Sequence, residues 1–399
     1  MGASEGSTAV LELFHPLIRS WFEQNVGTPT DIQRQAWPAI AGGEHVLVSA
    51  PTGSGKTLTA FLWALNQMVA GEWEVGQGIR ALYISPLKAL NNDINRNLSG
   101  PLLELRQAFE AAGESFPNIR VMTRSGDTPA NERGRMIRRP PDILITTPES
   151  LNILLTSRRG RTVFAPEPPS GAEPGAARLQ AAGSVRTVIL DEIHAVAGSR
   201  RGTHLITAVE RLTELTGEFQ RIALSATVRP LDVVAKFVGG YTLDDSRRRA
   251  DPAADFEFHP RPVRILETRA PKKIEIAVRA PGDFARLPVG EGEAQAEFNE
   301  YDGAANAPEE DAIWLALARE FTGIISRNRS TLFFTNSRRL AEKMTRLIND
   351  QSDEAQALCH HGSLSREIRM VVEERLKSGA LRAIVATSSL ELGIDIGSV

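Results

Sequence analysis

The chain has 399 residues, which is longer than an ordinary single domain and favours two domains. It contains 46 Lys or Arg and 49 Asp or Glu, which gives a formal net charge of -3 at pH 7. This near balance excludes a basic surface over the whole molecule, and any nucleic-acid contact has to come from local Lys and Arg. The single cysteine, Cys359, excludes an intramolecular disulfide framework and a cysteine-cluster metal site. No apolar run reaches the length of a membrane span. Together these observations predict an intracellular, cytoplasmic protein.

Short apolar runs alternate with helical patterns from Leu13 to about Gly239. The candidate strands are Val46–Ser49, Ala81–Ser85, Ile119–Thr123, Ile143–Thr146, Val185–Leu190 and Arg221–Ser225. Strands of this length separated by helices predict an α/β fold with a parallel sheet and crossover connections. The functional loops of such a sheet lie at the carboxyl ends of its strands.

A glycine-rich motif follows the first of these strands and reads Ala50-Pro51-Thr52-Gly53-Ser54-Gly55-Lys56-Thr57. Glycines here let backbone N–H groups face a polyphosphate at a helix N-terminus, Lys56 can reach the β- and γ-phosphates, and the Thr57 hydroxyl can ligate Mg²⁺. Ala50 stands where the usual pattern has its first glycine. We interpret the motif as an ATP site rather than an ordinary turn, because a strand precedes it and a helix follows it.

The strand at 185–190 ends in Asp191-Glu192-Ile193-His194. In a P-loop hydrolase Asp191 would hold Mg²⁺ through its water shell, and Glu192 would orient and deprotonate the attacking water. A solvated acidic turn is disfavoured because both motifs occur in the order that such an enzyme requires. Upstream, the amide of Gln33 in Thr30-Asp31-Ile32-Gln33 can pair with adenine N6 and N7, which would select ATP over GTP.

Two stretches interrupt the α/β order. Pro and Gly are dense near residues 160–184, which predicts a disordered surface insertion, and residues 241–260 have the composition of an interdomain linker. We therefore expect a first domain at 1–240 and a partial second domain at 261–399. Its expected elements are strands at Arg264–Thr268, Ile274–Val278, Thr331–Thr335 and Leu381–Ala386, an acidic solvated loop at Pro281–Asp311, and helices at Ala312–Ser326, Ser337–Asn349 and Ser365–Ser378.

Further motifs occur in the order found in superfamily 2 helicases. They are Phe14-His15-Pro16, Ser85-Pro86-Leu87-Lys88-Ala89-Leu90, Arg124-Ser125-Gly126-Asp127-Thr128, Thr146-Thr147-Pro148-Glu149-Ser150-Leu151, Ser225-Ala226-Thr227, Thr335-Asn336-Ser337, His360-His361-Gly362-Ser363-Leu364 and Ala386-Thr387-Ser388-Ser389-Leu390-Glu391-Leu392-Gly393-Ile394-Asp395. Together these motifs closely resemble the large-helicase-related (Lhr) family of DExH helicases. The resemblance covers nearly the whole chain.

This resemblance implies two tandem RecA-like P-loop domains with parallel sheets, which bind ATP and Mg²⁺ and a single nucleic-acid strand. The implied catalytic residues are Lys56, Asp191 and Glu192, with Thr57 and Asp191 at the metal. The implied nucleotide contacts are Thr30, Gln33, Thr52, Gly53, Ser54, Gly55, Lys56, Thr57, Gly393 and Asp395. Coupling is assigned to His194, Ser225 and Thr227. The strand contacts are Pro86, Lys88, Arg124, Thr147, Pro148, Thr335, Asn336, His361, Gly362, Thr387 and Ser388, which suit sequence-independent phosphate binding.

The motifs and the resemblance thus predict an ATP-dependent helicase or translocase; the resemblance alone implies that it acts 3′ to 5′ on single-stranded DNA in DNA repair. The alternatives are an RNA or RNA–DNA hybrid helicase and, from another class, a non-hydrolysing nucleic-acid-binding module. After Asp395 the printed chain stops at Val399, whereas the family continues into an arginine-rich motif. We therefore expect the second domain to be incomplete at its C-terminal end, and the chain to bind its ligands weakly and separate no duplex.

Overall fold

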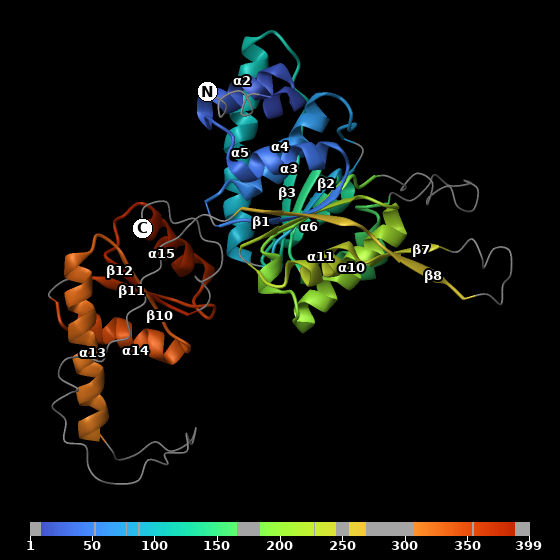
Figure 1. The fold of residues 1–399 in the computed structure, drawn as a ribbon. Coiled ribbons are helices and arrows are strands. Elements are labelled where there is room, and N and C mark those ends of the chain that lie inside the picture. The colour runs from blue at the N-terminus through green and yellow to red at the C-terminus, as the bar shows by residue number, and fades with distance from the viewer. Residues whose placement is uncertain are drawn as a thin grey trace. The chain divides into compact units, whose positions relative to one another are not determined.

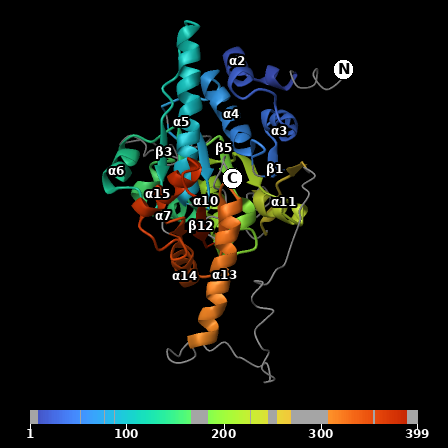
Figure 2. The ribbon, with the colours of Figure 1, turned by 90° about the vertical axis from the view of Figure 1, so that its left-hand side faces the viewer.

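The computed structural model describes residues 9–51, 53–76, 78–86, 88–165, 184–226, 228–244, 255–268, 307–352 and 355–387. The chain divides into two compact units, Met1–Ala270 and Pro271–Val399, and each is described by itself (Figures 1 and 2). Within the described part of the chain, every helix is too short or too polar to cross a membrane.

The first unit is built around a sheet of seven parallel strands in the order β3-β4-β2-β5-β6-β1-β9, as predicted for an α/β fold. These strands are β1 (His45–Ser49), β2 (Ala81–Ile84), β3 (Val121–Arg124), β4 (Ile143–Thr146), β5 (Thr187–Leu190), β6 (Gln220–Ser225) and β9 (Val263–Glu267). The helices are η1 (Val10–Leu13), α2 (Pro16–Asn25), α3 (Asp31–Ala41), α4 (Lys56–Val69), α5 (Lys88–Ala111), α6 (Ala130–Arg138), α7 (Pro148–Thr156), α8 (Arg158–Arg161), η2 (Ile193–Ala195), α10 (Arg200–Thr216) and α11 (Leu231–Gly239).

Alternation along the strands divides the buried side chains between two hydrophobic cores. On β2, Ala81 and Tyr83 belong to one core, and Leu82 and Ile84 belong to the other, because successive side chains of a strand point to opposite faces. Helices α2 to α5 supply the first core, whereas α7, α10 and α11 supply the second (Figure 1). Because both faces are covered, the strands read as continuous apolar runs, which is why the sequence reveals them.

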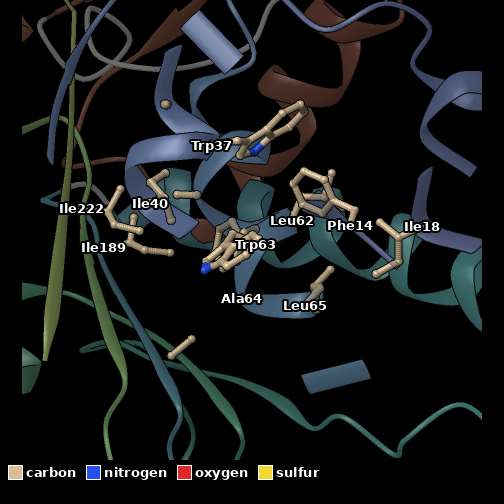
Figure 3. Packing of buried hydrophobic residues seen from close by; sticks show 14 of the residues in the cluster. Phe14, Ile18, Trp37, Ile40, Leu62, Trp63, Ala64, Leu65, Ile189 and Ile222 are labelled. Atoms are coloured by element: carbon tan, nitrogen blue, oxygen red, sulfur yellow. The ribbon is translucent and has the colours of Figure 1, made fainter. Parts of the chain in front are cut away.

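An aromatic cluster of Phe14, Trp37 and Trp63 packs the N-terminal helices against α4, the helix that follows the phosphate loop (Figure 3). The ring of Phe14 packs edge-on against Trp37 of α3 at 4.8 Å and against Trp63 of α4 at 5.7 Å between centroids. The buried indole N–H of Trp37 donates to the carbonyl of Thr59 in α4 at 3.1 Å. The cluster therefore holds α3, which carries Gln33, against α4, which begins at Lys56.

Strand register brings the predicted functional loops to one edge of the first sheet. Leu190 pairs with Ala223 of β6, and Ser225 of the same strand pairs with Ser49 of β1. The phosphate loop after β1 and the acidic pair after β5 therefore lie on either side of β6, at the carboxyl ends of parallel strands. This is where ligands bind in open α/β sheets.

The boundary between the two units differs from the one that composition predicts. The expected linker 241–260 contains the antiparallel strands β7 (Tyr241–Asp244) and β8 (Glu257–Pro260). The strand expected at 264–268 in the second domain is β9, and it pairs with β1 in the first sheet. A loop-like composition marks a break in periodicity and cannot distinguish a β-hairpin from a linker, which is why the predicted boundary is wrong. In the structure the first unit extends to Ala270.

The second unit contains a three-stranded parallel sheet in the order β10-β12-β11. Its elements are α13 (Ala307–Arg327), β10 (Thr331–Phe334), α14 (Arg338–Asn349), β11 (Ala357–His360), α15 (Arg366–Lys377) and β12 (Ala383–Ala386). Helices α13 and α14 pack on one face and α15 on the other. Strand β11 is absent from the predicted elements. The strand predicted at 274–278, most of the acidic segment, and residues 166–183 of the insertion predicted near 160–184 lie outside the described residues. Residues 160–165 of that insertion are ordered, contrary to the prediction: α8 ends at Arg161, and Val163 and Phe164 are buried in the second core of the first unit.

Candidate functional site

The phosphate loop has the backbone that its glycines predict. Gly53 and Gly55 have φ of 75° and 84°, in the left-handed region, and Gly55 is the N-cap of α4. A Cβ at Gly55 would lie 2.8 Å from Nε2 of Gln33, whereas a Cβ at Gly53 would meet no atom within 4 Å. Thr52 lies outside the described residues. The start of α4 therefore presents backbone N–H groups at a helix N-terminus, where anions bind.

Thr30 and Gln33 support this loop from the N-terminus of α3. The amide oxygen of Gln33 accepts the Thr30 N–H at 2.8 Å, and the Thr30 hydroxyl donates to the carbonyl of Ser54 at 2.9 Å. Gln33 is only 1% exposed. The structure thus places both residues against the phosphate loop. The pairing of Gln33 with adenine stays a prediction, because its amide oxygen already accepts the Thr30 N–H.

Lys56 is buried at the start of α4 and turns back to its own loop. Its ammonium donates to the carbonyls of Ala50 at 2.6 Å and Pro51 at 2.8 Å. The buried hydroxyl oxygen of Ser54 has no hydrogen-bond partner among the described residues. Buried polar groups are nearly always paired, so the Ser54 hydroxyl is suited to a ligand oxygen.

Asp191 lies directly after β5 and is 4% exposed. One carboxylate oxygen accepts the N–H of Glu192 at 2.9 Å, and the other accepts the hydroxyl of Tyr83. Burial raises the pKa of Asp191 to about 6, the charge of Glu192 adds to this effect, and the Tyr83 hydrogen bond and the charge of Lys56 oppose it. The carboxylate therefore lies in a dry site beside the phosphate loop.

Glu192 occupies a turn that few residues adopt. Its φ of 47° and ψ of 43° are left-handed, a conformation that costs a non-glycine residue on the order of 1 kcal/mol or more and that clusters at functional sites. Burial raises the pKa of the Glu192 carboxyl, and the nearby charge of Lys56 lowers it. A carboxylate with a raised pKa is better suited to accept a proton from water than an ordinary surface glutamate.

His194 connects this turn to the segment after β6. Its Nδ1 accepts the N–H of Ala226 at 3.3 Å and lies 3.3 Å from a carboxylate oxygen of Glu192. Burial lowers the pKa of His194, as does the charge of Lys56, so the neutral ring that can accept is favoured. The hydroxyl of Ser225 is buried without a partner among the described residues, and Thr227 lies outside them. His194 thus contacts the backbone of Ala226 rather than the Ser225 hydroxyl. The role of these residues in coupling ATP hydrolysis to nucleic-acid binding stays a prediction.

The nucleic-acid residues predicted in the first unit follow β2, β3 and β4. Pro86 follows β2, and Lys88 begins α5, where the backbone alone is described. Arg124 is buried and donates to the carbonyl of Ser125 at 2.5 Å. Thr147 is the N-cap of α7, and its hydroxyl accepts the Ser150 N–H at 3.3 Å; Pro148 is buried at the first position of that helix. The residues share one sheet edge, where Arg124, Thr147 and Pro148 are buried.

In the second unit, the predicted contacts follow the carboxyl ends of β10, β11 and β12. The Thr335 hydroxyl donates to the carbonyl of Ser337 at 3.1 Å, Asn336 and Gly362 are exposed, and the Thr387 N–H donates to His360 at 3.2 Å. His361 is buried and its Nε2 lies 2.9 Å from a carboxylate oxygen of Glu342. Ser388, Gly393 and Asp395 lie outside the described residues. The Nε2 atom of His361 therefore already has a partner, Glu342, within the second unit.

Two family models match this chain. The DEAD/DEAH box helicase model matches residues 30–234, and the helicase conserved C-terminal domain model matches residues 315–399. The chain belongs to the DEAD/DEAH box helicase family. These matches and the solved relatives confirm the α/β fold of tandem RecA-like domains.

Lhr proteins are similar to this helicase chain over nearly its whole length, which confirms the resemblance that the motifs predict. ATP-dependent helicase Lhr-Core protein 2 of Thermococcus barophilus is 41% identical over 98% of the chain and 40% of its own length. Lhr helicase/uracil glycosylase of Escherichia coli is 39% identical over 98% of the chain and 25% of its own length. The structure of Mycobacterium smegmatis Lhr bound to ssDNA and AMP-PNP has a TM-score of 0.77 and 41% identity, covering 98% of this chain and 43% of that one. The chain spans less than half the length of these relatives.

Tyr83 is a site residue of this helicase chain that the sequence does not predict. It lies in the middle of β2, is fully buried, and contacts Asp191 through its hydroxyl. In the sequence it reads as one more core residue of an apolar strand. The available indication is chemical, because a buried tyrosine hydroxyl usually needs a hydrogen-bond partner.

Proposed function

We propose that this chain is an ATP-driven motor of the Lhr type, which moves 3′ to 5′ along single-stranded DNA. The observation that carries the proposal is the buried pair Asp191 and Glu192 at the end of β5, on the same sheet edge as the Lys56 loop. The Mycobacterium smegmatis Lhr structure, with ssDNA and AMP-PNP bound, supports both ligand classes.

The residues divide the work of phosphoryl transfer between binding and water activation. Lys56 would exchange the carbonyls of Ala50 and Pro51 for phosphate oxygens, and the N–H groups at the start of α4 would hold the same phosphates. Glu192 would orient the attacking water and take its proton. Little covalent chemistry is required, since positioning and charge neutralisation supply most of the catalysis.

The residues present fit a magnesium ion. Thr57 and Asp191 offer a hydroxyl and a carboxylate, the oxygen ligands that Mg²⁺ prefers, and the Tyr83 hydroxyl holds Asp191. A site of this kind usually takes one or two protein ligands and completes its coordination with phosphates and water. When bound, Mg²⁺ would neutralise charge on the β- and γ-phosphates.

The choice of DNA, the polarity and a role in DNA repair belong to the proposal. The Escherichia coli relative bears the name helicase/uracil glycosylase, and glycosylases act on bases in nucleic acid, which supports repair. Neighbours solved with ssRNA or RNA, such as Mss116p and Dbp5, are 15% and 16% identical and support the fold alone. A cytoplasmic location rests on the sequence.

Glu192→Gln tests the proposed chemistry. The variant keeps the size of the side chain and removes the base, so it should bind a fluorescent ATP analogue like the wild type and release phosphate about 10² to 10⁴ times more slowly with ssDNA present. Glu132→Gln, an exposed carboxylate on α6, is the matched control and should hydrolyse ATP normally. Phosphate release by Glu192→Gln at the wild-type rate would assign the base elsewhere. A wild-type chain that binds both ligands without hydrolysis would support the non-hydrolysing alternative.

Polarity and substrate need a separate measurement. Streptavidin bound to either end of a single strand is displaced only when a motor runs into it. The chain, which is expected to bind its ligands weakly, should release it slowly, from the 5′ end of DNA and not from the 3′ end. The same strands in RNA form the comparison. Faster displacement on RNA, or release from the 3′ end, would contradict the proposal.

A further inference from the structure

We propose that Tyr83 is a positioning residue for the magnesium ligand Asp191, because its buried hydroxyl holds the carboxylate of the acidic turn. The inference deepens the proposed function and rests on ATP being the ligand. It assigns a functional role to a residue that otherwise belongs to the apolar core.

Strand register places Tyr83 beside the acidic turn. Tyr83 pairs with Ile189 of β5, and Asp191 is two residues further along, on the same face of the sheet. The hydroxyl of Tyr83 donates to the Asp191 oxygen that Glu192 leaves free. Both carboxylate oxygens are thereby held, which fixes the orientation of a side chain that burial keeps from water.

Helix α4 fixes the ring of the same tyrosine. The Tyr83 ring stacks on Phe61 of α4 with centroids 4.9 Å apart and an interplanar angle of 19°. Phe61 lies one turn after Thr57 on the same helix face. The ring of Tyr83 is thus fixed by Phe61, and its hydroxyl reaches the acidic turn through the bond to Asp191.

The number of protons sets the direction of this hydrogen bond. A carboxylate only accepts, so the single proton of the Tyr83 hydroxyl goes to Asp191. The carboxylate is thereby held in one orientation, and its remaining lone pairs are available to a cation or to the water shell of that cation. Groups that orient metal ligands in this way typically change metal affinity by about 10- to 100-fold when removed.

Tyr83→Phe in the full chain tests the inference, since it removes the hydroxyl and keeps the stacked ring. The measurement is binding of a fluorescent ADP across a Mg²⁺ titration and in EDTA. We expect the Mg²⁺ concentration at half-saturation to rise about 10- to 100-fold, while ADP affinity in EDTA stays within about twofold of the wild type. Phe61→Leu is the control for packing, because it removes the stacking partner and keeps the hydroxyl; its Mg²⁺ requirement should stay close to that of the wild type.

An unchanged Mg²⁺ requirement in Tyr83→Phe would overturn the inference. So would an equal loss of ADP affinity with Mg²⁺ and with EDTA, or a rise in Mg²⁺ requirement in Phe61→Leu as large as that in Tyr83→Phe. A wild-type chain that binds no ADP under either condition would instead overturn the proposed function. For a variant that is poorly folded at the assay temperature, thermal melting gives the same comparison, as the extra stabilisation by ADP with Mg²⁺ over ADP with EDTA.

Discussion

Gly53 and Gly55 share a backbone conformation and differ in their surroundings. They therefore distinguish two reasons why a position requires glycine, namely a positive φ and a lack of space for a Cβ atom. Both have positive φ, which costs an L-residue about 1–2 kcal/mol. Only Gly55 has Gln33 within 2.8 Å of a Cβ position. The backbone cost is therefore common to both sites, and the close approach of the buried amide belongs to Gly55 alone.

We predict that Gly53→Ala lowers the free energy of unfolding by about 1–2 kcal/mol and that Gly55→Ala lowers it further. The extra loss reflects displacement of Gln33 and of its bond to Thr30. Urea denaturation without nucleotide measures both variants under equal conditions. Equal losses would show that Gln33 moves aside at no cost.

His45 at the start of β1 gives the first unit a pH-dependent stability. Its Nδ1 accepts the N–H of Arg221 at 3.1 Å. Burial lowers the pKa of His45, the charges of Arg221 and Arg261 lower it further, and Glu218 opposes them. The folded protein therefore keeps this ring neutral at a pH where the unfolded chain, with a pKa of about 6.5, takes up a proton.

We predict that this contribution to stability is fully present above about pH 6.5 and is lost as the pH falls toward the lowered pKa of folded His45. In His45→Asn the amide oxygen can still accept the Arg221 N–H, and nothing titrates. The unfolding free energy of the variant should consequently fall less than that of the wild type between neutral and mildly acidic pH. Parallel pH profiles from urea titrations would contradict this assignment.

Among the elements, β9 shows where an edge strand contributes to the core. Leu266 is 5% exposed and belongs to the same core as β1 and α4, whereas its neighbour Ile265 is 38% exposed. The two residues point to opposite faces of one strand. They form a matched pair for testing whether β9 is part of the first unit.

We predict that Leu266→Ala destabilises the first unit by about 2–5 kcal/mol, as buried leucine truncations do, and that Ile265→Ala costs much less. Denaturation followed by loss of nucleotide binding reports on this unit. If Leu266→Ala left that transition unchanged, β9 would belong with the second domain, as the composition suggested.

The elements also show how far the sequence alone leads. The predicted strands at 46–49 and 143–146 match β1 and β4 within a residue, because buried parallel strands are apolar throughout. Strand β11 reads Ala357-Leu358-Cys359-His360 and contains no β-branched residue, so its sequence does not indicate a strand. The site was predictable as a set of motifs. The link through Tyr83 was not, since it depends on the register of β2 with β5 and on the helix face of α4.

On the scale of the whole molecule, a net charge of -3 limits how strongly a nucleic-acid strand can be held by long-range attraction. Lys88 and Arg124 are the lysine and arginine among the predicted contacts; His361 is paired with Glu342, and the other predicted contacts carry no charge. Each neutralised phosphate of a single strand contributes about -0.7 to the slope of log affinity against log salt.

We predict a slope of about -1.4 for binding of single-stranded DNA by the chain, which corresponds to two neutralised phosphates. Lys88→Gln should make the slope shallower by about 0.7 and weaken all sequences alike. Fluorescence anisotropy over a series of salt concentrations measures both. A much steeper slope would mean that further cations contact the strand.

The pairing of β1 with β9 has a consequence for the order of events during synthesis. The strand that leads into the phosphate loop obtains one of its two neighbours from residues 263–267, long after the loop itself has left the ribosome. Until then β1 has an open edge, and the nucleotide site is built on an incomplete sheet. Chains fold as units once their parts are present, so the nascent protein should become able to hold a nucleotide only when the last strand of this sheet has emerged.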